Sequence, residues 1–452
     1  MNLGSLFLID TLAITISALV AVVALIVMQY AKNYLHGDQK QGAFYVKLSA
    51  LLASTWLMLL SNNILVFIAF FFLANYFLSL LMIHKQAWGA AKEAGGMALG
   101  YFSLGAVALL SFAGICYYSL GTLSITEIVQ NLGALPKNLS ILAFVSLLVA
   151  ALAQCSQIPF HKWLLSSMNS PTPVSALMHA GLVNGGGFLL VRFHTLITSE
   201  PSFMVTIFFA GIISAFIASL WSFTQNTVKA KLVCSTISQM GFMIAQIGLG
   251  LFGAAISHLC MHGFFKAFHF LAAGSTLTKE YVKKVPLSLP SKLFRFAFSL
   301  AVAYFALQIF ISQSHIAFEW FSSSSILLLF VFMSLAQVAY TVSQHLRSSF
   351  VFAIAIFTSF TVSFLYGNMI HLFELFLQQD TQDYIYHITI WQYFALVPFV
   401  GVWFAMNFKQ NLLEALPEGL QFKLYSMIHS SSLSPLKVNT VNRFDYNYKE
   451  AK

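Results

Sequence analysis

Charged residues are scarce in this chain of 452 residues: Asp, Glu, Lys and Arg together make up 8% of it. An ordinary soluble domain contains roughly a quarter charged residues. With 59% hydrophobic residues, the chain has more apolar surface than a water-soluble fold of this length can bury. The composition therefore excludes a soluble enzyme, a nucleic-acid-binding domain and a disordered scaffold, and it predicts a polytopic membrane protein.

Cysteine is also rare, and its spacing excludes two further classes. The four cysteines lie in apolar stretches and form no C-x-x-C pair. A disulfide framework and a zinc ribbon both require closer, paired spacing. We expect the four to be small buried apolar side chains: Cys116, Cys155, Cys234 and Cys260.

Long apolar runs predict an all-α fold with about 13 transmembrane helices in residues 1–407, because a spanning helix needs about 20 apolar residues. Two intervals, 122–134 and 368–383, are expected to be short amphipathic or loop segments. Residues 408–452 form a basic tail, in which 407–428 predict an amphipathic helix at the membrane surface. The first run has no basic residue before it, which predicts a retained helix rather than a signal peptide. The expected segments are 5–30, 44–61, 63–84, 96–118, 138–158, 172–195, 203–223, 230–250, 252–275, 294–312, 325–345, 350–367 and 388–407.

The net charge of +9 has an uneven distribution along the chain. Loops that follow odd-numbered helices, together with the tail, hold 20 of the 23 basic residues. By the positive-inside rule, these loops and the C-terminus are cytoplasmic and the N-terminus lies outside. The basic excess is thus a signal of membrane topology and requires no nucleic acid.

Four ionisable residues share one stripe of the segment 252–275. At about 100° per residue, His258, His262, Lys266 and His269 fall within one sector of roughly 80°. Ionisable groups at membrane depth are costly and usually functional, and imidazoles suit a proton relay. A satisfied helix–helix contact is the alternative. A metal site that includes Cys260 has little support, because Cys260 lies about 200° from His258 on a helix.

Prolines and glycines mark a second feature, in residues 157–187. Pro159, Pro171 and Pro173 interrupt helical hydrogen bonding, and in membranes such breaks are tolerated where they face protein or a wet cavity. Pro171 and Pro173 can also simply start a helix, which would place His179 about two turns inside it. The run Gly185–Gly187 would let a neighbouring helix approach closely.

A third feature is the segment that begins at Lys229 and continues through Ser235, Ser238 and Gln239. These polar side chains can bond across helices. Lys229 and Lys231 are equally explained as anchors that extend to the membrane surface.

Together these three motifs resemble the antiporter-like membrane subunits of proton-pumping NADH:quinone oxidoreductase and of multisubunit sodium/proton antiporters. The resemblance covers roughly residues 60–280 and is closest to the DabB-type subunits of DabA–DabB inorganic-carbon accumulation systems. The stretches that favour DabB are Thr224-Gln-Asn-Thr-Val-Lys229, Ser235-Thr-Ile-Ser-Gln-Met-Gly-Phe-Met243, Gly248-Leu-Gly-Leu251 and His179-Ala-Gly.

The resemblance implies a fold with broken helices and inverted repeats, and a polar axis at mid-membrane that moves a cation, most simply a proton. It also implies a cytoplasmic DabA-like zinc partner that hydrates carbon dioxide to bicarbonate. This chain would then be a transporter subunit rather than an enzyme, with no metal or other cofactor of its own. By resemblance, the residues of the polar axis are His179, Lys229, His258, His262 and Lys266.

The chain departs from the family pattern at an expected ion pair. A lysine is expected three residues before the Gln-x-Pro of the broken helix, where this chain has Gln154. A glutamate is expected on an earlier helix, where the matching stretch is Phe70-Phe71-Phe72. An ion pair of changing separation can shift a neighbour's pKa and drive proton movement, so its loss favours a passive or partner-gated pathway. Two alternatives stay open: a subunit of a respiratory complex or cation/proton antiporter, and a non-conducting anchor for a soluble partner.

Overall fold

The computed structural model describes residues 7–85, 87–274, 288–316, 318–345, 350–377, 383–408 and 417–433. In these ranges helices are the only regular elements, and β-structure is limited to isolated bridges. Ten apolar helical segments are long enough to cross a membrane. They are α1 (Thr11–Tyr34), α2 (Gln41–Leu59), α3 (Ile64–Met82), α4 (Gly89–Leu120), α6 (Lys137–Gln154), α8 with α9 (Thr172–Ala180 and Gly185–Arg192), α11 (Pro201–Thr224), α14 (Leu289–Ser314), α15 (Ser323–His345) and α16 (Phe350–Leu377).

The prediction of an all-α chain is confirmed, but by length and hydropathy the described residues contain ten spans rather than thirteen. Two of the other predicted segments are long helices that carry many polar residues, α12 (Val228–Gly248) and α13 (Phe252–Leu271). The last predicted segment is divided into two short helices, α17 (Ile390–Phe394) and α18 (Val397–Phe408). The polar residues that lower the hydropathy of α13 are those of the predicted stripe.

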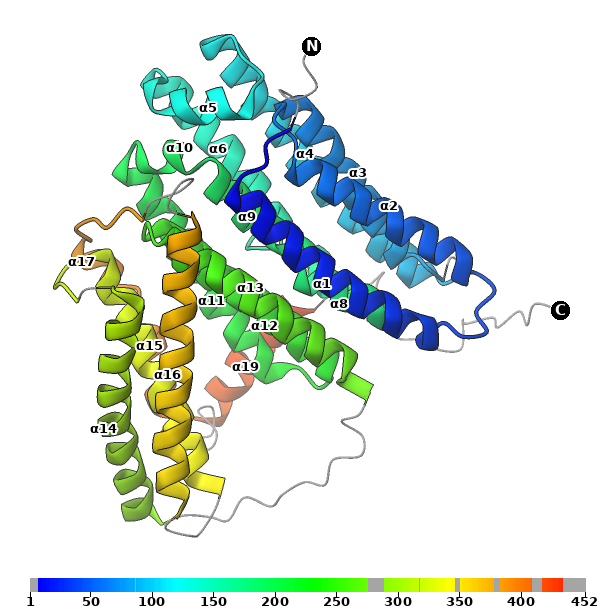
Figure 1. Cartoon of the computed structure of the whole chain (residues 1–452). Helices are drawn as coiled ribbons and strands as arrows, with labels where there is room; N and C mark the ends of the chain where they lie inside the picture. Colours follow the sequence, from blue (N-terminus) through cyan, green and yellow to red (C-terminus); the bar gives the residue numbers. More distant parts are fainter. Residues whose placement is uncertain are drawn as a thin grey trace.

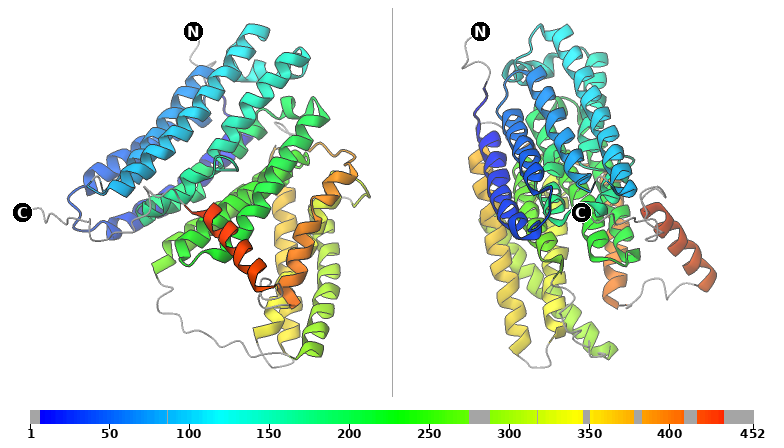
Figure 2. Two further views of the ribbon diagram at one scale, coloured as in Figure 1. Left: turned by 180° about the vertical axis from the view of Figure 1, so that it is seen from behind. Right: turned by 90° about the vertical axis from the view of Figure 1, so that its right-hand side faces the viewer.

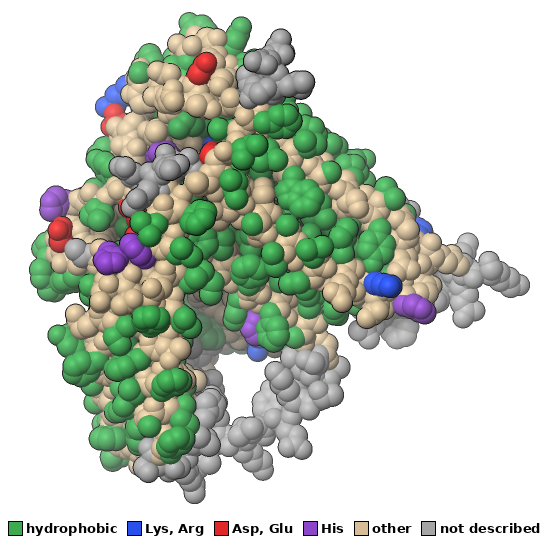
Figure 3. Space-filling view, viewed as in Figure 1, with side chains coloured by type: hydrophobic (Ala, Val, Ile, Leu, Met, Phe, Trp, Pro, Cys, Tyr) green, Lys and Arg blue, Asp and Glu red, His purple; other side chains and the backbone are tan. Residues whose placement is uncertain are grey.

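The helices form three groups, with the polar helices in the middle (Figure 1). The first group is α2, α3, α4 and α6, and the last is α14, α15 and α16, which pack on one another. Between them lie α11, α12 and α13, together with α1 and the α8–α9 pair, which both contact α13. On the face seen in Figure 3, hydrophobic side chains predominate and most of the few charged ones lie toward the edges. This is the surface expected of a lipid-embedded bundle.

Two helices are broken at the centre of the bundle. The predicted break at Pro159 separates α6 from the short α7 (Lys162–Ser166), and a 3-10 turn at Leu182–Asn184 separates α8 from α9. Side chains at the first break donate hydrogen bonds to backbone carbonyls at the second. Gln154 Nε2 donates to the Leu182 carbonyl at 2.9 Å, and Cys155 Sγ donates to the Val183 carbonyl at 3.1 Å. Carbonyls freed in the apolar interior are thus satisfied by protein, as a membrane fold requires.

The structure also decides between the two interpretations of the prolines after this break. Pro171 precedes the first residue of α8 and Pro173 lies in its first turn. Both prolines therefore start a helix, and His179 lies near the end of α8.

Glycines bring the backbones of the central helices into direct contact. A Cβ atom on Gly186 would lie 2.2 Å from the Ala151 carbonyl oxygen, which confirms the predicted close approach at the glycine run. A Cβ atom on Gly241 of α12 would lie 2.7 Å from the amide nitrogen of Ala215 on α11. Because the obstructing atoms are backbone, these sites have little room to relax.

We therefore expect Gly241→Ala to lower the stability of the fold by about 1–3 kcal/mol, the cost of overpacking a close-packed interior. Gly114 on α4 is the matched control, since its Cβ would meet nothing within 4 Å. The thermal unfolding midpoint of the purified variants in detergent measures the effect. Equal midpoints for Gly241→Ala and Gly114→Ala would contradict the close contact between α11 and α12.

Within the interval 368–383, expected to be a short amphipathic or loop segment, residues 368–377 are helical. α16 continues to Leu377 because apolar residues continue there and its polar residues recur every three positions on one face. Two of these residues contact a neighbouring segment: the exposed Asn368 donates to Gln313 at 3.0 Å, and the ring centroids of His371 and His315 lie 4.3 Å apart. The other interval, 122–134, contains only the short α5 (Ile125–Asn131) and a 3-10 turn, as predicted.

A C-terminal helix, α19 (Glu418–Ser432), lies against the end of α11 (Figure 2). Trp221 Nε1 donates to Ser431 Oγ at 2.9 Å, and Gln225 Nε2 donates to Ser432 Oγ at 2.8 Å. The amphipathic helix predicted at 407–428 thus begins and ends later, and its residues 409–416 lie outside the described residues. The remainder of the predicted basic tail, from residue 434 on, also lies outside them.

Candidate functional site

The predicted stripe of α13 faces the interior of the bundle. Lys266 is fully buried, His262 is buried and His258 is half-buried, whereas Met261, Phe264 and Phe265 on the opposite face are exposed. The three polar side chains recur every fourth residue, so they lie above one another along about 12 Å of helix. We call these three side chains, with His179 and Lys229, the polar axis. His269, the fourth member of the predicted stripe, is half-buried between the rings of Phe265 and Phe268.

Lys266 is held by a backbone carbonyl. Its Nζ donates to the carbonyl of Leu232 on α12 at 2.8 Å. It also interacts electrostatically with His179 on α8 and with His262 one turn away. Within the described ranges there are two ion pairs, His84–Asp38 and Arg192–Asp10, and neither includes Lys266. A buried amine without a carboxylate partner is expensive to keep charged, so this lysine is suited to exchange its proton.

The histidines of the polar axis are surrounded by unsatisfied polar atoms. His179 is fully buried with its ring stacked on Phe270, at 4.3 Å between ring centroids. Among the described residues, five atoms near α13 are buried without a hydrogen-bond partner: both ring nitrogens of His179, Nε2 of His262, Nε2 of Gln246 and Oγ of Ser257. Buried polar groups in proteins are almost always satisfied, by protein or by water. This cluster therefore favours a hydrated axis.

Two polar residues outside the predicted set extend the polar axis beyond His258. The ring Nδ1 of His258 lies 3.0 Å from Oε1 of Gln246 on α12, and the hydroxyl of Tyr366 on α16 interacts with the same amide group. His258 and His262 have ring centroids 6.1 Å apart. Sequence reasoning missed both residues, since an isolated Gln or Tyr in an apolar run gives no signal until the fold brings it next to a histidine.

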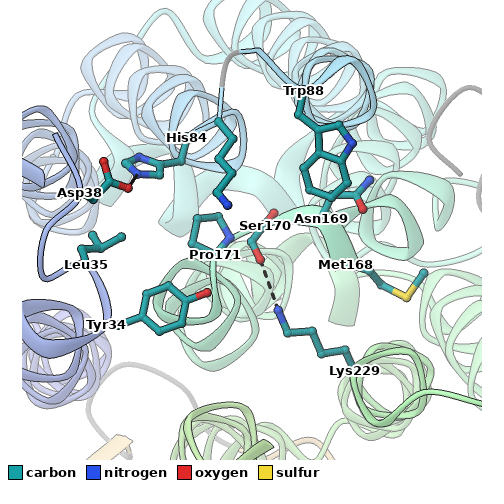
Figure 4. Close-up of a pocket in the computed structure, with 11 residues that line it drawn as sticks. Tyr34, Leu35, Asp38, His84, Trp88, Met168, Asn169, Ser170, Pro171 and Lys229 are labelled. Carbon is teal, nitrogen blue, oxygen red and sulfur yellow. Dashed lines mark hydrogen bonds and ion pairs between the residues drawn. The ribbon is translucent and has the colours of Figure 1, made fainter. Parts of the chain in front are cut away.

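Lys229 lies at the other end, in a cavity of about 400 Å³ that the loops after α1 and α3 share with the start of α8 (Figure 4). Its Nζ extends to the carbonyl of Ser170 at 3.4 Å. It also interacts electrostatically with His179, which connects the cavity to the polar axis. We call this cavity the lysine pocket; its lining includes Tyr34, Asp38, His84, Lys85, Trp88, Asn169 and Ser170.

An acid–imidazole pair forms one wall of the lysine pocket. His84 Nε2 lies 2.9 Å from Asp38 Oδ2. Partial burial acts to raise the pKa of Asp38, but the hydrogen bonds from His84 and the Lys40 amide and the charge of Lys85 outweigh it. The pKa of Asp38 therefore lies below its ordinary value, and this carboxylate stays ionised at the mouth of the pocket.

The position of the expected ion pair is occupied by two amides. Gln154 and Asn75 on α3 exchange two hydrogen bonds, at 3.0 and 3.1 Å, and both side chains are buried. The side chain that faces Gln154 is Asn75, three residues beyond the stretch 70–72 that was matched to the expected carboxylate. Phe72 is 38% exposed, whereas Asn75 is buried and bonds to Gln154. A neutral, reciprocally bonded pair therefore replaces the charged one.

Comparisons with known proteins agree with this geometry. The profile of a family described as "NADH:quinone oxidoreductase/Mrp antiporter, TM" matches residues 61–294, and that of "NADH-Ubiquinone oxidoreductase (complex I), chain 5 N-terminus" matches residues 1–45. The chain is 34% identical to a probable inorganic carbon transporter subunit DabB1 of Halothiobacillus neapolitanus over 61% of this chain and 50% of that protein. It is 33% identical to an NAD(P)H-quinone oxidoreductase chain 5 of Synechocystis over 60% of this chain and 41% of that protein.

A solved structure shares the fold. A chain of the Mrp complex from Dietzia sp. DQ12-45-1b superposes with a TM-score of 0.64 at 20% identity, covering 93% of this chain and 52% of that one. The present chain spans about half the length of the curated relatives that it matches. Because a family profile matches more than half of the chain, this polytopic all-α protein belongs to the NADH:quinone oxidoreductase/Mrp antiporter transmembrane family.

Proposed function

We propose that this chain is the membrane subunit of an inorganic-carbon transporter, in which the polar axis conducts protons to drive bicarbonate accumulation. The observation that carries the proposal is the row of buried imidazoles and one buried amine along α13, surrounded by unsatisfied polar atoms. The likeness to relatives that are named as inorganic carbon transporter subunits supports the substrate. The hydration of carbon dioxide would belong to a DabA-like zinc protein bound on the cytoplasmic face.

The amide pair of Asn75 and Gln154 favours a conduit over an autonomous pump. Because both side chains are neutral, the contact between α3 and the end of α6 is not an ion pair whose separation could shift the pKa of a neighbour. A proton would then move down its gradient when the partner permits it. The basic loops favour an inner-membrane orientation with the C-terminus and the lysine pocket facing the cytoplasm.

Co-purification from native membranes tests this assignment directly. The full chain, carrying an affinity tag, should bring with it a soluble zinc protein, identified by mass spectrometry and metal analysis. The pair of proteins, expressed together in a bacterium that lacks carbonic anhydrase, should restore growth in air and uptake of labelled inorganic carbon. Isolation of antiporter-like or redox subunits instead, with no carbon uptake, would assign the chain to a respiratory or cation-antiporter complex.

Lys229 provides a second test, because a matched residue lies two positions away. Lys229 lines the lysine pocket, whereas Lys231 on the same helix is exposed. We expect Lys229→Gln to reduce labelled-carbon uptake by the complex at least tenfold, within the range that positioned proton-transfer groups contribute, and Lys231→Gln to leave it unchanged. If the two variants behave alike, Lys229 is only a membrane-surface anchor.

A further inference from the structure

Two partly buried carboxyl groups, Glu374 and Asp383, lie at the end of the polar axis away from the lysine pocket. Glu374, near the end of α16, packs against the first turn of α13: a Cβ atom on Gly253 would lie 2.5 Å from its Cγ. Asp383, on the segment that follows α16, accepts the Gly253 amide at 3.0 Å. Glu374 and Asp383 also hydrogen bond to each other. Both residues come from the part of the chain beyond the recognisable family motifs.

Two carboxyl groups can hydrogen bond only if one of them carries a proton. The surroundings decide which one. Asp383 accepts hydrogen bonds from the backbone amides of Phe252 and Gly253, the first two residues of α13. At the start of a helix, free N–H groups and the helix dipole stabilise a negative charge. Asp383 is therefore the carboxylate, and Glu374 holds the proton. Burial nevertheless raises the pKa of Asp383 above its ordinary value.

A buried hydroxyl lies on α13 between this pair and the polar axis. Ser257 lies one turn along α13 from Gly253, about 40° away around the helix, on the side where Glu374 packs. Its side chain is fully buried and its Oγ has no hydrogen-bond partner in the described part of the chain. Because side chains tilt toward the N-terminus of their helix, this hydroxyl points back toward the carboxyl pair. The next residue is His258.

Other ionisable groups at this end do not replace the pair. His194 on α10 (His194–Thr198) contacts the ring of Phe252 edge-on, at 5.6 Å between centroids. Arg192 is paired with Asp10. The remaining groups on the neighbouring segments are His371 of α16, which is in ring contact with His315, and Tyr384 and Tyr386 beside Asp383.

We propose that Glu374 and Asp383 form a proton-binding carboxyl pair that exchanges protons between the aqueous phase at this end and His258 of the polar axis. In this exchange, the Glu374 carboxyl releases its proton through the Ser257 hydroxyl or water to the His258 imidazole. The resulting carboxylate is reprotonated from the aqueous phase. The C-terminal half thus supplies the acidic group that the amide pair at Asn75 and Gln154 lacks. This inference rests on the proposed proton route, and it adds where protons enter or leave.

Infrared spectroscopy of the purified complex in lipid tests proton binding without any transport. At neutral pH the wild type should show a protonated-carboxyl stretch that shifts in D₂O. Glu374→Gln should remove this band, and Asp383→Asn should move it because the hydrogen-bond acceptor changes. Glu319→Gln is the matched control, an exposed carboxylate near the same end of the bundle, and it should leave the band intact. No such band in the wild type, or the same band in every variant, overturns the inference.

Uptake of labelled inorganic carbon by the same complexes separates this inference from the proposed function. We expect uptake to fall at least tenfold in Glu374→Gln and Asp383→Asn and to stay at the wild-type level in Glu319→Gln. If both pair variants transport normally while Lys266 variants are inactive, the pair lies outside the route and the inference fails alone. If Lys266 variants also transport normally, the proposed function itself fails.

Discussion

Replacing Lys266 with alanine should abolish inorganic-carbon uptake while the protein still folds and inserts. The variant removes the amine that joins His179 to His262 at the centre of the polar axis. The Leu232 carbonyl stays satisfied after the change, because it also accepts the Thr236 hydroxyl at 3.0 Å. We therefore expect a loss of uptake of about two orders of magnitude or more, the contribution of positioned proton-transfer groups, with little loss of stability. His262→Ala should have the same phenotype.

The Lys266→Arg variant tests whether the site needs proton release or only a positive charge. Lys266→Arg keeps a positive charge, but a guanidinium does not release its proton in proteins, so this variant should be as inactive as alanine. Lys92 on α4 is exposed and serves as the control. Cells that carry the Lys92→Ala variant should grow in air like cells with the wild-type protein. Growth in air, labelled-carbon uptake and the amount of protein in the membrane are the measurements. Full activity of Lys266→Arg would show that the site needs only a fixed charge.

Replacing Asn75 and Gln154 with a charged pair should lower the stability of the fold much less than changing either residue alone. Gln154→Lys alone places an amine among Asn75, the Leu182 carbonyl and Gly185, without a countercharge. Asn75→Asp alone buries a carboxylate of nearly the same shape as the native amide. An uncompensated buried charge costs about 3–5 kcal/mol, so each single variant should lower the thermal unfolding midpoint markedly.

The double variant should recover much of this loss, because the new charges face each other where the amides exchange two hydrogen bonds. Unfolding midpoints of the four proteins in detergent form a double-mutant cycle that isolates the pair interaction. Strictly additive losses would mean that residues 75 and 154 do not interact, which would contradict the observed pairing.

Much of the architecture could be predicted from patterning alone, because helix length and apolar runs are nearly sufficient in a membrane. The errors arose where polar side chains lie on a long helix and contact neighbouring segments of the protein. Asn368, His371 and Glu374 lowered the apolarity of 368–383 and suggested a loop, but in the folded bundle they bond to neighbouring segments. The same contacts explain why Glu374 was not recognised as a candidate site residue.

At the candidate site, too, the residues on one helix could be predicted from the sequence, whereas their partners on other helices could not. The spacing of His258, His262 and Lys266 placed them on one face, since they lie on one helix with a fixed period. Their partners on other helices could not be inferred in this way. Gln246, Tyr366 and Asn75 reach the site only through tertiary packing. The match of the absent carboxylate to residues 70–72 stays a prediction, because an apolar helix offers several equally good alignments.

Water along α13 is the most direct test of the central claim that the polar axis conducts protons. A cryo-electron microscopy map of the complex in lipid, at a resolution that shows ordered water, should contain water density between His179, His262 and Lys266. That density should continue toward the lysine pocket in one direction and toward Glu374 in the other. A dry, close-packed interior around these side chains, with no water reaching either surface, would contradict proton conduction through this chain.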